Sequence, residues 1–151
     1  WHNSGEWHSA GGLKFGSVEL AEARFPLHFD KHEFRQDSAG DGQFRGWTGV
    51  DLELTVETDK PALANTAGDG IKYGSRGMVG GQDSKAHEYS LRKKDGTARQ
   101  LKTKEISVNV DPGDKLIIRS AGGGGWGDPV KRSSEARALD FKNEITSDNK
   151  A

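Results

Sequence analysis

The chain has 151 residues, with 22 Lys and Arg against 23 Asp and Glu, and it contains no cysteine. This length fits one domain, and the balanced charge excludes a general nucleic-acid-binding surface. The missing cysteines exclude disulfides, thiolate zinc sites and cysteine nucleophiles, and no apolar stretch is long enough to span a membrane. Because a chain without cysteine fits a reducing compartment, we expect it in the cytoplasm.

The apolar content is low for a chain of this size. Leu, Ile, Val and Phe together make up just under a fifth of the residues, whereas 21 residues are Gly. A fraction this low barely fills a core, but the interspersed charges argue against disorder. We therefore expect a folded, core-poor chain that leans on a partner.

Three regions follow from the patterning. Residues 1–16 hold Trp1 and Trp7 without a clear period, and we expect an extended arm that packs on a partner or on its own domain. Residues 17–145 form a single β-rich domain. Residues 146–151 are polar, which indicates a frayed tail.

The first expected strands lie between residues 27 and 66. Residues 27–35 form an extended run after Pro26, and the change of parity between Phe29 and Phe34 indicates a bulge. Residues 50–56 alternate Val or Leu with acidic or polar residues, which predicts a strand with one buried face. The acidic face would then meet water or a basic partner. Residues 62–66 are expected to add a shorter strand.

Two hairpins are predicted further along. Asp95-Gly96 between alternating residues is a strong hairpin signal. The turn at 111–114 is expected to join strands at 106–110 and 116–118 into a second hairpin. The expected fold is therefore mainly β, with two packed or barrel-like antiparallel sheets, irregular Gly-rich segments and one C-terminal helix.

The glycine run is the most unusual segment. Gly122, Gly123, Gly124 and Gly125 precede Trp126, and four glycines in a row persist only where backbones pack closely, as in bundled polyproline-like segments. We expect these residues, with Trp7 of the arm, to serve packing or an interface. A helix capped by Ser133 or Ser134 follows, with Ala138, Phe141 and Ile145 on one stripe.

Catalytic readings of the same residues are weaker. A phosphate-binding loop needs Lys and Ser or Thr after the glycines, but Asp128 and Pro129 stand there. His28, Asp30 and His32 share one face of a regular strand and suit Zn, Fe or Mn, but alternation alone predicts a solvated polar face here, and the expected bulge would break their register. We therefore assign no catalytic, cofactor-binding or metal residue to this chain.

Two segments carry a resemblance to a known family. The first joins Phe25-Pro26-Leu27 to RQDSAGDGQFRG at 35–46, and the second joins DPGD at 111–114 to GGGGWGDP at 122–129. A third, weaker segment is GMVGG at 77–81. In order and separation they resemble the C-terminal part of hydantoinase B/5-oxoprolinase chains, over residues 17–145.

The resemblance implies a role inside a complex. The family includes ATP-dependent cyclic-amide hydrolases and ATP-dependent carboxylases of acetone and acetophenone, in which hydantoinase A-like subunits hold the ATP site. B-type chains are several times longer than this one, and the metal ligands associated with them lie in the N-terminal part. The resemblance therefore implies a small non-catalytic subunit of an acetophenone-carboxylase-type enzyme. This subunit would complete a hetero-oligomer with larger hydantoinase A-like and B-like subunits.

The partners would then supply the reaction. The resemblance implies that ATP, Mg or Mn and bicarbonate bind the partner subunits and that none binds this chain. A part of a cyclic-amide hydrolase of the same family is the first alternative. An autonomous β module that binds a metal or small ligand through His28, Asp30 and His32 is the second.

Overall fold

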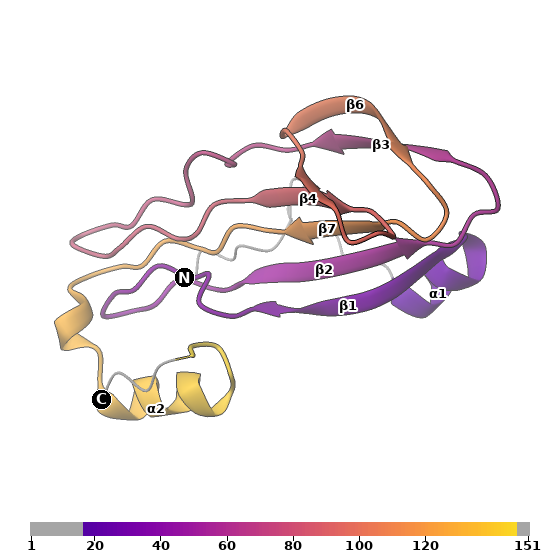
Figure 1. Cartoon of the computed structure of the whole chain (residues 1–151). Coiled ribbons are helices and arrows are strands. Elements are labelled where there is room, and N and C mark those ends of the chain that lie inside the picture. The colour runs from indigo at the N-terminus through magenta and orange to yellow at the C-terminus, as the bar shows by residue number, and fades with distance from the viewer. Residues whose placement is uncertain (1–16, 148–151) are drawn as a thin grey trace.

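The computed structural model describes residues 17–147, which form two antiparallel β-sheets and two short α-helices (Figure 1). The strand order of the larger sheet is β1-β2-β7-β4-β5, and β3 pairs with β6 in a second sheet. The mainly β prediction is confirmed. The elements, in chain order, are α1 (Val18–Arg24), β1 (Leu27–Arg35), β2 (Gly49–Val56), β3 (Ala62–Ala67), β4 (Glu88–Arg92), β5 (Ala98–Gln100), β6 (Lys104–Val110), β7 (Lys115–Arg119), the 3-10 turn η1 (Pro129–Lys131) and α2 (Ser134–Lys142).

The larger sheet is open. Within residues 17–147, β1 and β5 are its two edges, so the barrel-like version of the expected fold is wrong and the two-sheet version holds. The expected arm at 1–16, with Trp7, and the last residues of the expected tail lie outside the described residues. No helix in the described part of the chain has the length and apolar character needed to cross a membrane.

A bulge in β1 sets which side chains share a face. The pairing of β1 with β2 shifts register between Phe29 and Lys31, as the change of parity predicted. Leu27 and Phe29 lie opposite Val56 and Leu54, and after the bulge His32 and Phe34 lie opposite Leu52 and Val50. Because directly paired residues project to the same side, all of these side chains occupy one face of the sheet.

The other face of the larger sheet is charged. The strand predicted at 50–56 is β2, and its acidic residues find basic partners inside the chain, so no external basic partner is needed. Asp51 lies 3.0 Å from Lys31 Nζ and 3.3 Å from Arg119 Nε, and Glu53 lies 3.7 Å from Arg92. These pairs account for the polar half of the alternation.

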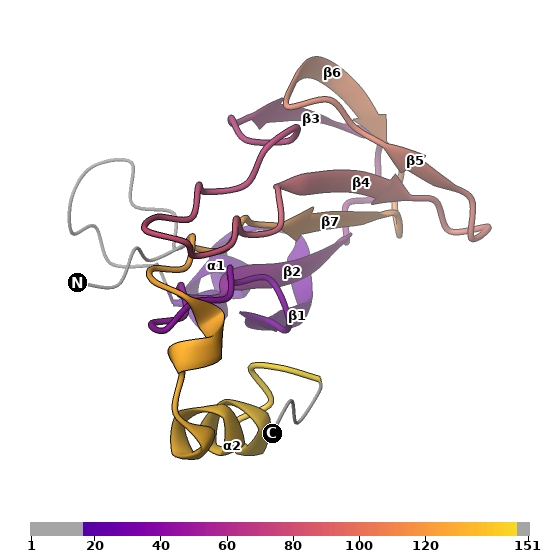
Figure 2. The ribbon, with the colours of Figure 1, turned by 90° about the vertical axis from the view of Figure 1, so that its left-hand side faces the viewer.

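The core lies between the two sheets. Its buried residues come from β2, β4 and β6 and from the segment after β5. Figure 2 shows the β3–β6 pair above β4 and β5, with β1 and β2 further down the sheet. The core therefore lies between the β3–β6 pair and the β4 side of the larger sheet. Its members are Val56, Tyr89, Leu91, Leu101, Val108 and Val110.

One predicted hairpin is confirmed and one is wrong. Asp95-Gly96 turns the chain between β4 and β5, and Gly96 adopts φ +89°. The turn at 111–114 does not make a hairpin, because β6 pairs with β3 whereas β7 pairs with β2 and β4. Asp114 is buried there and accepts hydrogen bonds from Lys93 Nζ and the Lys94 N–H, which directs β7 into the larger sheet.

The C-terminal helix forms where expected, but a different interaction holds it. Ser133 caps α2 and accepts a hydrogen bond from the Ala136 N–H at 3.2 Å. The expected apolar stripe is wrong, because Phe141 is exposed and Ile145 lies beyond the end of the helix. The only residue of α2 that is buried is Asp140.

Candidate functional site

The glycine run crosses a layer of irregular backbone at one end of the sheets (Figure 1, left). It lies between residues 38–47 and residues 74–84 and is hydrogen-bonded to both. Gly123 accepts from the Gly40 N–H at 2.9 Å and donates to the Trp47 carbonyl at 2.7 Å. Gly125 donates to the Gln82 carbonyl at 2.9 Å and accepts from the Met78 N–H at 2.8 Å. We call these three segments the glycine layer.

The layer has no room for side chains at the run. A Cβ atom added to Gly122 would lie 2.2 Å from the Ser38 carbonyl oxygen, and one added to Gly124 would lie 2.1 Å from that of Arg76. At Gly125 the distance to the Asp41 oxygen would be 2.0 Å. These distances are far below van der Waals contact, and the neighbours are backbone atoms. Glycine is therefore required by the close approach of three chain segments.

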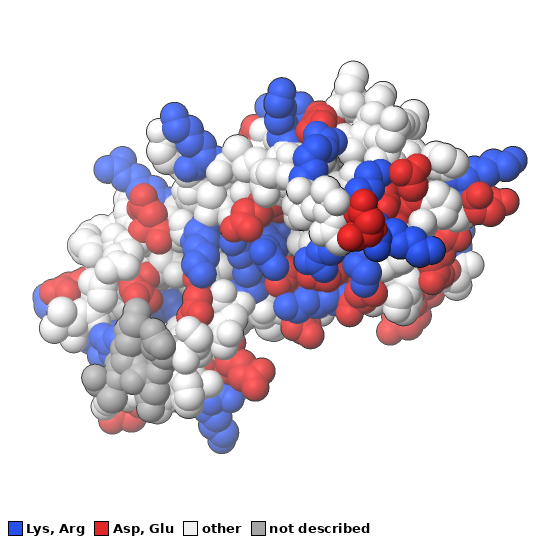
Figure 3. Space-filling view, viewed as in Figure 1, with Lys and Arg blue, Asp and Glu red and all other residues white. Residues whose placement is uncertain are grey.

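Exposed apolar side chains stand on the glycine layer and on the η1 turn that follows it. Five of them are between 47% and 84% exposed, and we call them the tip patch: Phe44, Met78, Val79, Trp126 and Val130. Backbone bridges connect Trp126 to Phe44 on one side and to Met78 on the other, and the Phe44 and Trp126 rings lie 5.7 Å apart. Figure 3 shows Lys and Arg side chains interspersed with Asp and Glu over the face of the molecule seen in Figure 1.

Val79 of the tip patch is strained. Its φ of +55° lies in the left-handed region, which a β-branched residue rarely adopts. The turn is closed by a hydrogen bond from the Gly81 N–H to the Met78 carbonyl at 3.0 Å. Strain of this kind costs about 1–3 kcal/mol and is found at functional contacts. The turn thus holds an apolar side chain out toward the surroundings.

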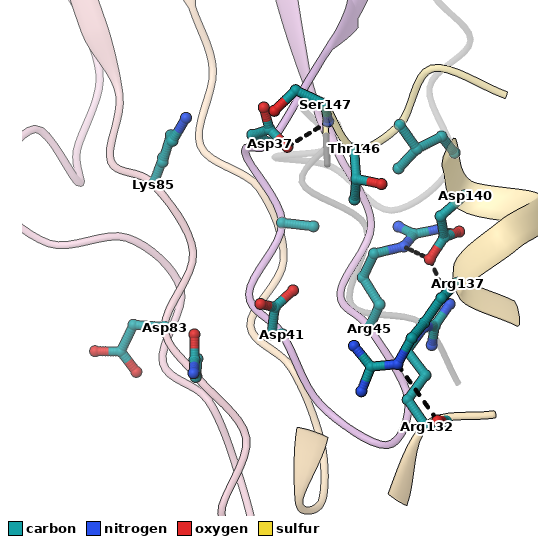
Figure 4. Close-up of a pocket in the computed structure, with 13 residues that line it drawn as sticks. Asp37, Asp41, Arg45, Asp83, Lys85, Arg132, Arg137, Asp140, Thr146 and Ser147 are labelled. Carbon is teal, nitrogen blue, oxygen red and sulfur yellow. Dashed lines mark hydrogen bonds and ion pairs between the residues drawn. The ribbon is translucent and has the colours of Figure 1, made fainter. Parts of the chain in front are cut away.

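A polar cavity of about 390 Å³ adjoins the glycine layer (Figure 4). On its wall Asp140 accepts hydrogen bonds from Arg45 at 2.9 and 3.0 Å and from Arg132 at 2.6 Å. Burial opposes the charge of Asp140, but the two guanidinium groups outweigh it and hold the pKa of this carboxyl below its ordinary value. This ion-pair cluster fastens α2 to the glycine layer.

Sequence reasoning missed this cluster. Arg45 and Asp140 are separated by 95 residues, and no local spacing links them. One feature of the sequence indicated this contact. The apolar stripe expected on the C-terminal helix was short, so the helix needed a further attachment to the rest of the chain. A second attachment follows the helix, where the Asp37 N–H donates to the Ile145 carbonyl at 3.0 Å.

The residues proposed for a metal do not come together. The bulge places His32 on the apolar face, 6.5 Å from the Phe29 ring, and opposite to the side of His28. His28 lies 3.1 Å from Glu22, and Asp30 accepts from Lys115 Nζ at 2.7 Å. Among residues 17–147 no group of three His, Asp or Glu side chains is arranged to hold a metal ion. The shared face that a regular strand predicted is therefore wrong.

The structure places Trp126 at the surface of the glycine layer. Its ring is 47% exposed, and the layer is held by its backbone, which exchanges two 2.9 Å hydrogen bonds with Phe44. After the run, the Asp128 carboxylate accepts the Val130 N–H at 3.0 Å. A carboxylate therefore occupies the place where a phosphate loop would present its first free donors.

The fold and site define a class of protein first. An open sheet with one charged and one apolar face is joined to a glycine layer that carries exposed apolar side chains. Residues 3–129 match the Hydantoinase B/oxoprolinase family, and the chain belongs to this family.

Most of this chain is similar to part of several longer relatives. Caprolactamase subunit beta of Pseudomonas jessenii is 30% identical over 97% of this chain and 26% of its own length. The crystal structure of the ATP-dependent caprolactamase from that organism superposes with a TM-score of 0.73 and 27% identity, over 87% of this chain and 23% of that chain. An acetone carboxylase structure gives a TM-score of 0.68 at 19% identity, over 88% and 22%, which shows the fold alone. The chain thus spans about a quarter of these relatives.

Proposed function

We propose that this chain is a non-catalytic, structural part of an ATP-dependent enzyme of the hydantoinase B family. It completes a complex with larger hydantoinase A-like and B-like subunits, which bind ATP and Mg or Mn. The observation that carries the proposal is the tip patch, because five exposed apolar side chains on a rigid glycine layer form a surface suited to protein contact.

Two reactions fit this role. The sequence resemblance favoured carboxylation of a ketone such as acetone or acetophenone, with bicarbonate on a partner subunit. The 30% identity to caprolactamase subunit beta, over nearly the whole chain, favours the opening of a cyclic amide. Because the acetone carboxylase likeness is one of fold alone, we place the cyclic-amide hydrolase first and the ketone carboxylase second.

Native mass spectrometry of the protein, purified gently from its own source, tests the structural role. We expect an assembly that contains a hydantoinase A-like chain and a B-type chain or segment. ATP hydrolysis by this assembly, stimulated by caprolactam or a hydantoin, would support the cyclic-amide reaction, whereas stimulation only by a ketone with bicarbonate would support the carboxylase. A 16.4 kDa monomer that hydrolyses ATP by itself would contradict the proposal.

Trp126→Ala separates a packing role from an interface role. Because Trp126 is half exposed and its ring lies 5.7 Å from that of Phe44, we expect the free energy of unfolding to fall by about 1 kcal/mol, rather than the 3–5 kcal/mol of a buried ring. Affinity for the partner subunits should fall by tenfold or more. Chemical denaturation of the chain and native mass spectrometry of the complex measure the two effects. A large loss of stability with unchanged assembly would show that the ring serves packing.

A further inference from the structure

One half of the apolar face of the larger sheet is only partly covered. Eight residues of β1, β2 and β7 share this side, and we call them the open apolar face. His32 and Phe34 are exposed, Phe34 at 57%, and the others are half-buried. The neighbouring helix α1 contacts β1 but buries none of its own residues. The eight residues are Phe29, His32, Phe34, Val50, Leu52, Leu54, Leu116 and Ile118.

Among residues 17–147, the partly covered half of this face begins where the core ends. The β3–β6 pair covers the β4 end of the face, and an apolar cavity of about 290 Å³ lies between β3 and the middle strands. Leu52, Leu116 and Ile118 line both this cavity and the open apolar face. The core therefore continues through Leu116 and Ile118 into the open apolar face.

A buried imidazole marks the same cavity. His87 lines it, stacks on Tyr89 at 6.1 Å, and has a buried Nδ1 atom with no hydrogen-bond partner. Burial lowers the pKa of His87, and the charge of Arg35 lowers it further, so the ring favours its neutral form. A buried nitrogen without a hydrogen-bond partner is a second sign that the packing here is incomplete.

The opposite face of the sheet does not share this deficit. Its charged side chains pair with one another, as in Lys31 with Asp51 and Arg119 with Asp51 and Glu88. Ile117 is paired with Glu53 and Ser90 on this face and is buried. Within residues 17–147, the partly covered apolar side chains of the larger sheet therefore lie on one side of it.

The relatives indicate what packs on the open apolar face. This chain corresponds to 26% of caprolactamase subunit beta and to 23% of the crystallised caprolactamase chain, so about three quarters of the B-type fold lies outside it. An interface that resembles a core cut in half is typical of permanent association. We propose that the remaining part of the hydantoinase B-type fold packs on the open apolar face and inserts apolar side chains into the apolar cavity. This inference rests on the proposed function.

A second copy of this chain is a poorer occupant. Two copies facing each other would bury both open apolar faces but would leave the other three quarters of the B-type fold without a matching surface. The tip patch stands on the glycine layer and the η1 turn and serves a separate contact. Each surface is therefore tested by its own variant.

A charged substitution on the face tests the placement in the intact complex. Phe34→Glu is the test variant, and Leu63→Glu is its control, because Leu63 is 66% exposed on the outer side of β3. We expect both chains to keep their β-sheet circular dichroism and cooperative unfolding. Where the B-type part is a separate subunit, Phe34→Glu should lose at least 90% of it in native mass spectrometry, and Leu63→Glu should retain it. Where it is the same polypeptide, cross-linking from position 34 is the test.

Cross-linking identifies the occupant directly. A photoreactive phenylalanine analogue placed at position 34 should give cross-linked peptides from the non-matching part of a B-type sequence, whether that part is a separate subunit or the same polypeptide. Cross-links to a second copy of this chain, to residues 1–16 or only to the A-like subunit would overturn the inference. If the complex assembles with a separate B-type subunit but Phe34→Glu is silent, only this inference fails, whereas absence of any complex defeats the proposed function.

Discussion

Replacing Gly125 with Ala should unfold the glycine layer. The added methyl carbon would lie 2.0 Å from the Asp41 carbonyl oxygen and 2.5 Å from the carbonyl carbon, and both belong to backbone fixed on either side. The Asp41 oxygen also accepts the Gln82 N–H at 2.7 Å, so relief by moving this peptide would break a second contact. We expect a loss of about 3 kcal/mol or more in the free energy of unfolding.

Gly96→Ala is the control for this substitution. Gly96 has no atom within 4 Å of an added Cβ, but its φ of +89° makes any side chain strained. The expected cost is about 1 kcal/mol, because only backbone conformation is at stake. Urea denaturation of both variants compares a steric requirement for glycine with a conformational one. Equal losses of stability in the two variants would mean that the segments of the glycine layer can move apart at little cost. Close backbone packing would then not be what holds the layer together.

Removing the carboxylate of Asp140 should release α2 from the glycine layer. The side chain is 9% exposed and holds Arg45 and Arg132 together, so Asp140→Ala leaves two guanidinium groups facing each other without an anion. Loss of one member of a buried ion pair costs about 3–5 kcal/mol. A nine-residue helix has little stability alone, so we expect amide exchange in α2 to lose its protection while β2 and β7 keep theirs.

An exposed ion pair provides the control. Asp111 lies 2.8 Å from Lys93 Nζ with its side chain 56% exposed, and Asp111→Ala should cost no more than about 1 kcal/mol. If Asp140→Ala leaves the exchange of α2 unchanged, the attachment between Asp37 and Ile145 must hold the helix without the ion pairs.

The same cluster predicts a dependence on pH. The pKa of Asp140 is lowered in the folded chain, so folding favours the ionised form. Its contribution is fully present above the unfolded pKa of about 3.9 and is lost as the pH falls through the lower folded value. Asp140→Asn should therefore flatten the acid side of the stability curve, measured by denaturation between pH 6 and about pH 2.

Local patterning determined much of the fold. Alternation in residues 50–56, the turn residues Asp95-Gly96 and the change of parity after Phe29 each depend on neighbouring residues, and each was readable from the sequence. The sequence also pointed to close packing at the glycine run, because side chains cannot explain four consecutive glycines. Family membership followed from the order of short motifs, without any catalytic residue.

Only the tertiary structure decided how these pieces meet. β6 leaves its expected hairpin to pair with β3, because pairing partners distant in sequence leave no local trace. In a regular strand His28, Asp30 and His32 would share a face, but one extra residue in β1 reverses the side on which His32 lies. Asp140 binds arginines from two segments, and the open apolar face is visible only once β3 and β6 are seen to cover half of the sheet. Periodicity along a chain fixes which side chains share a face, whereas the coverage of that face depends on contacts between distant segments.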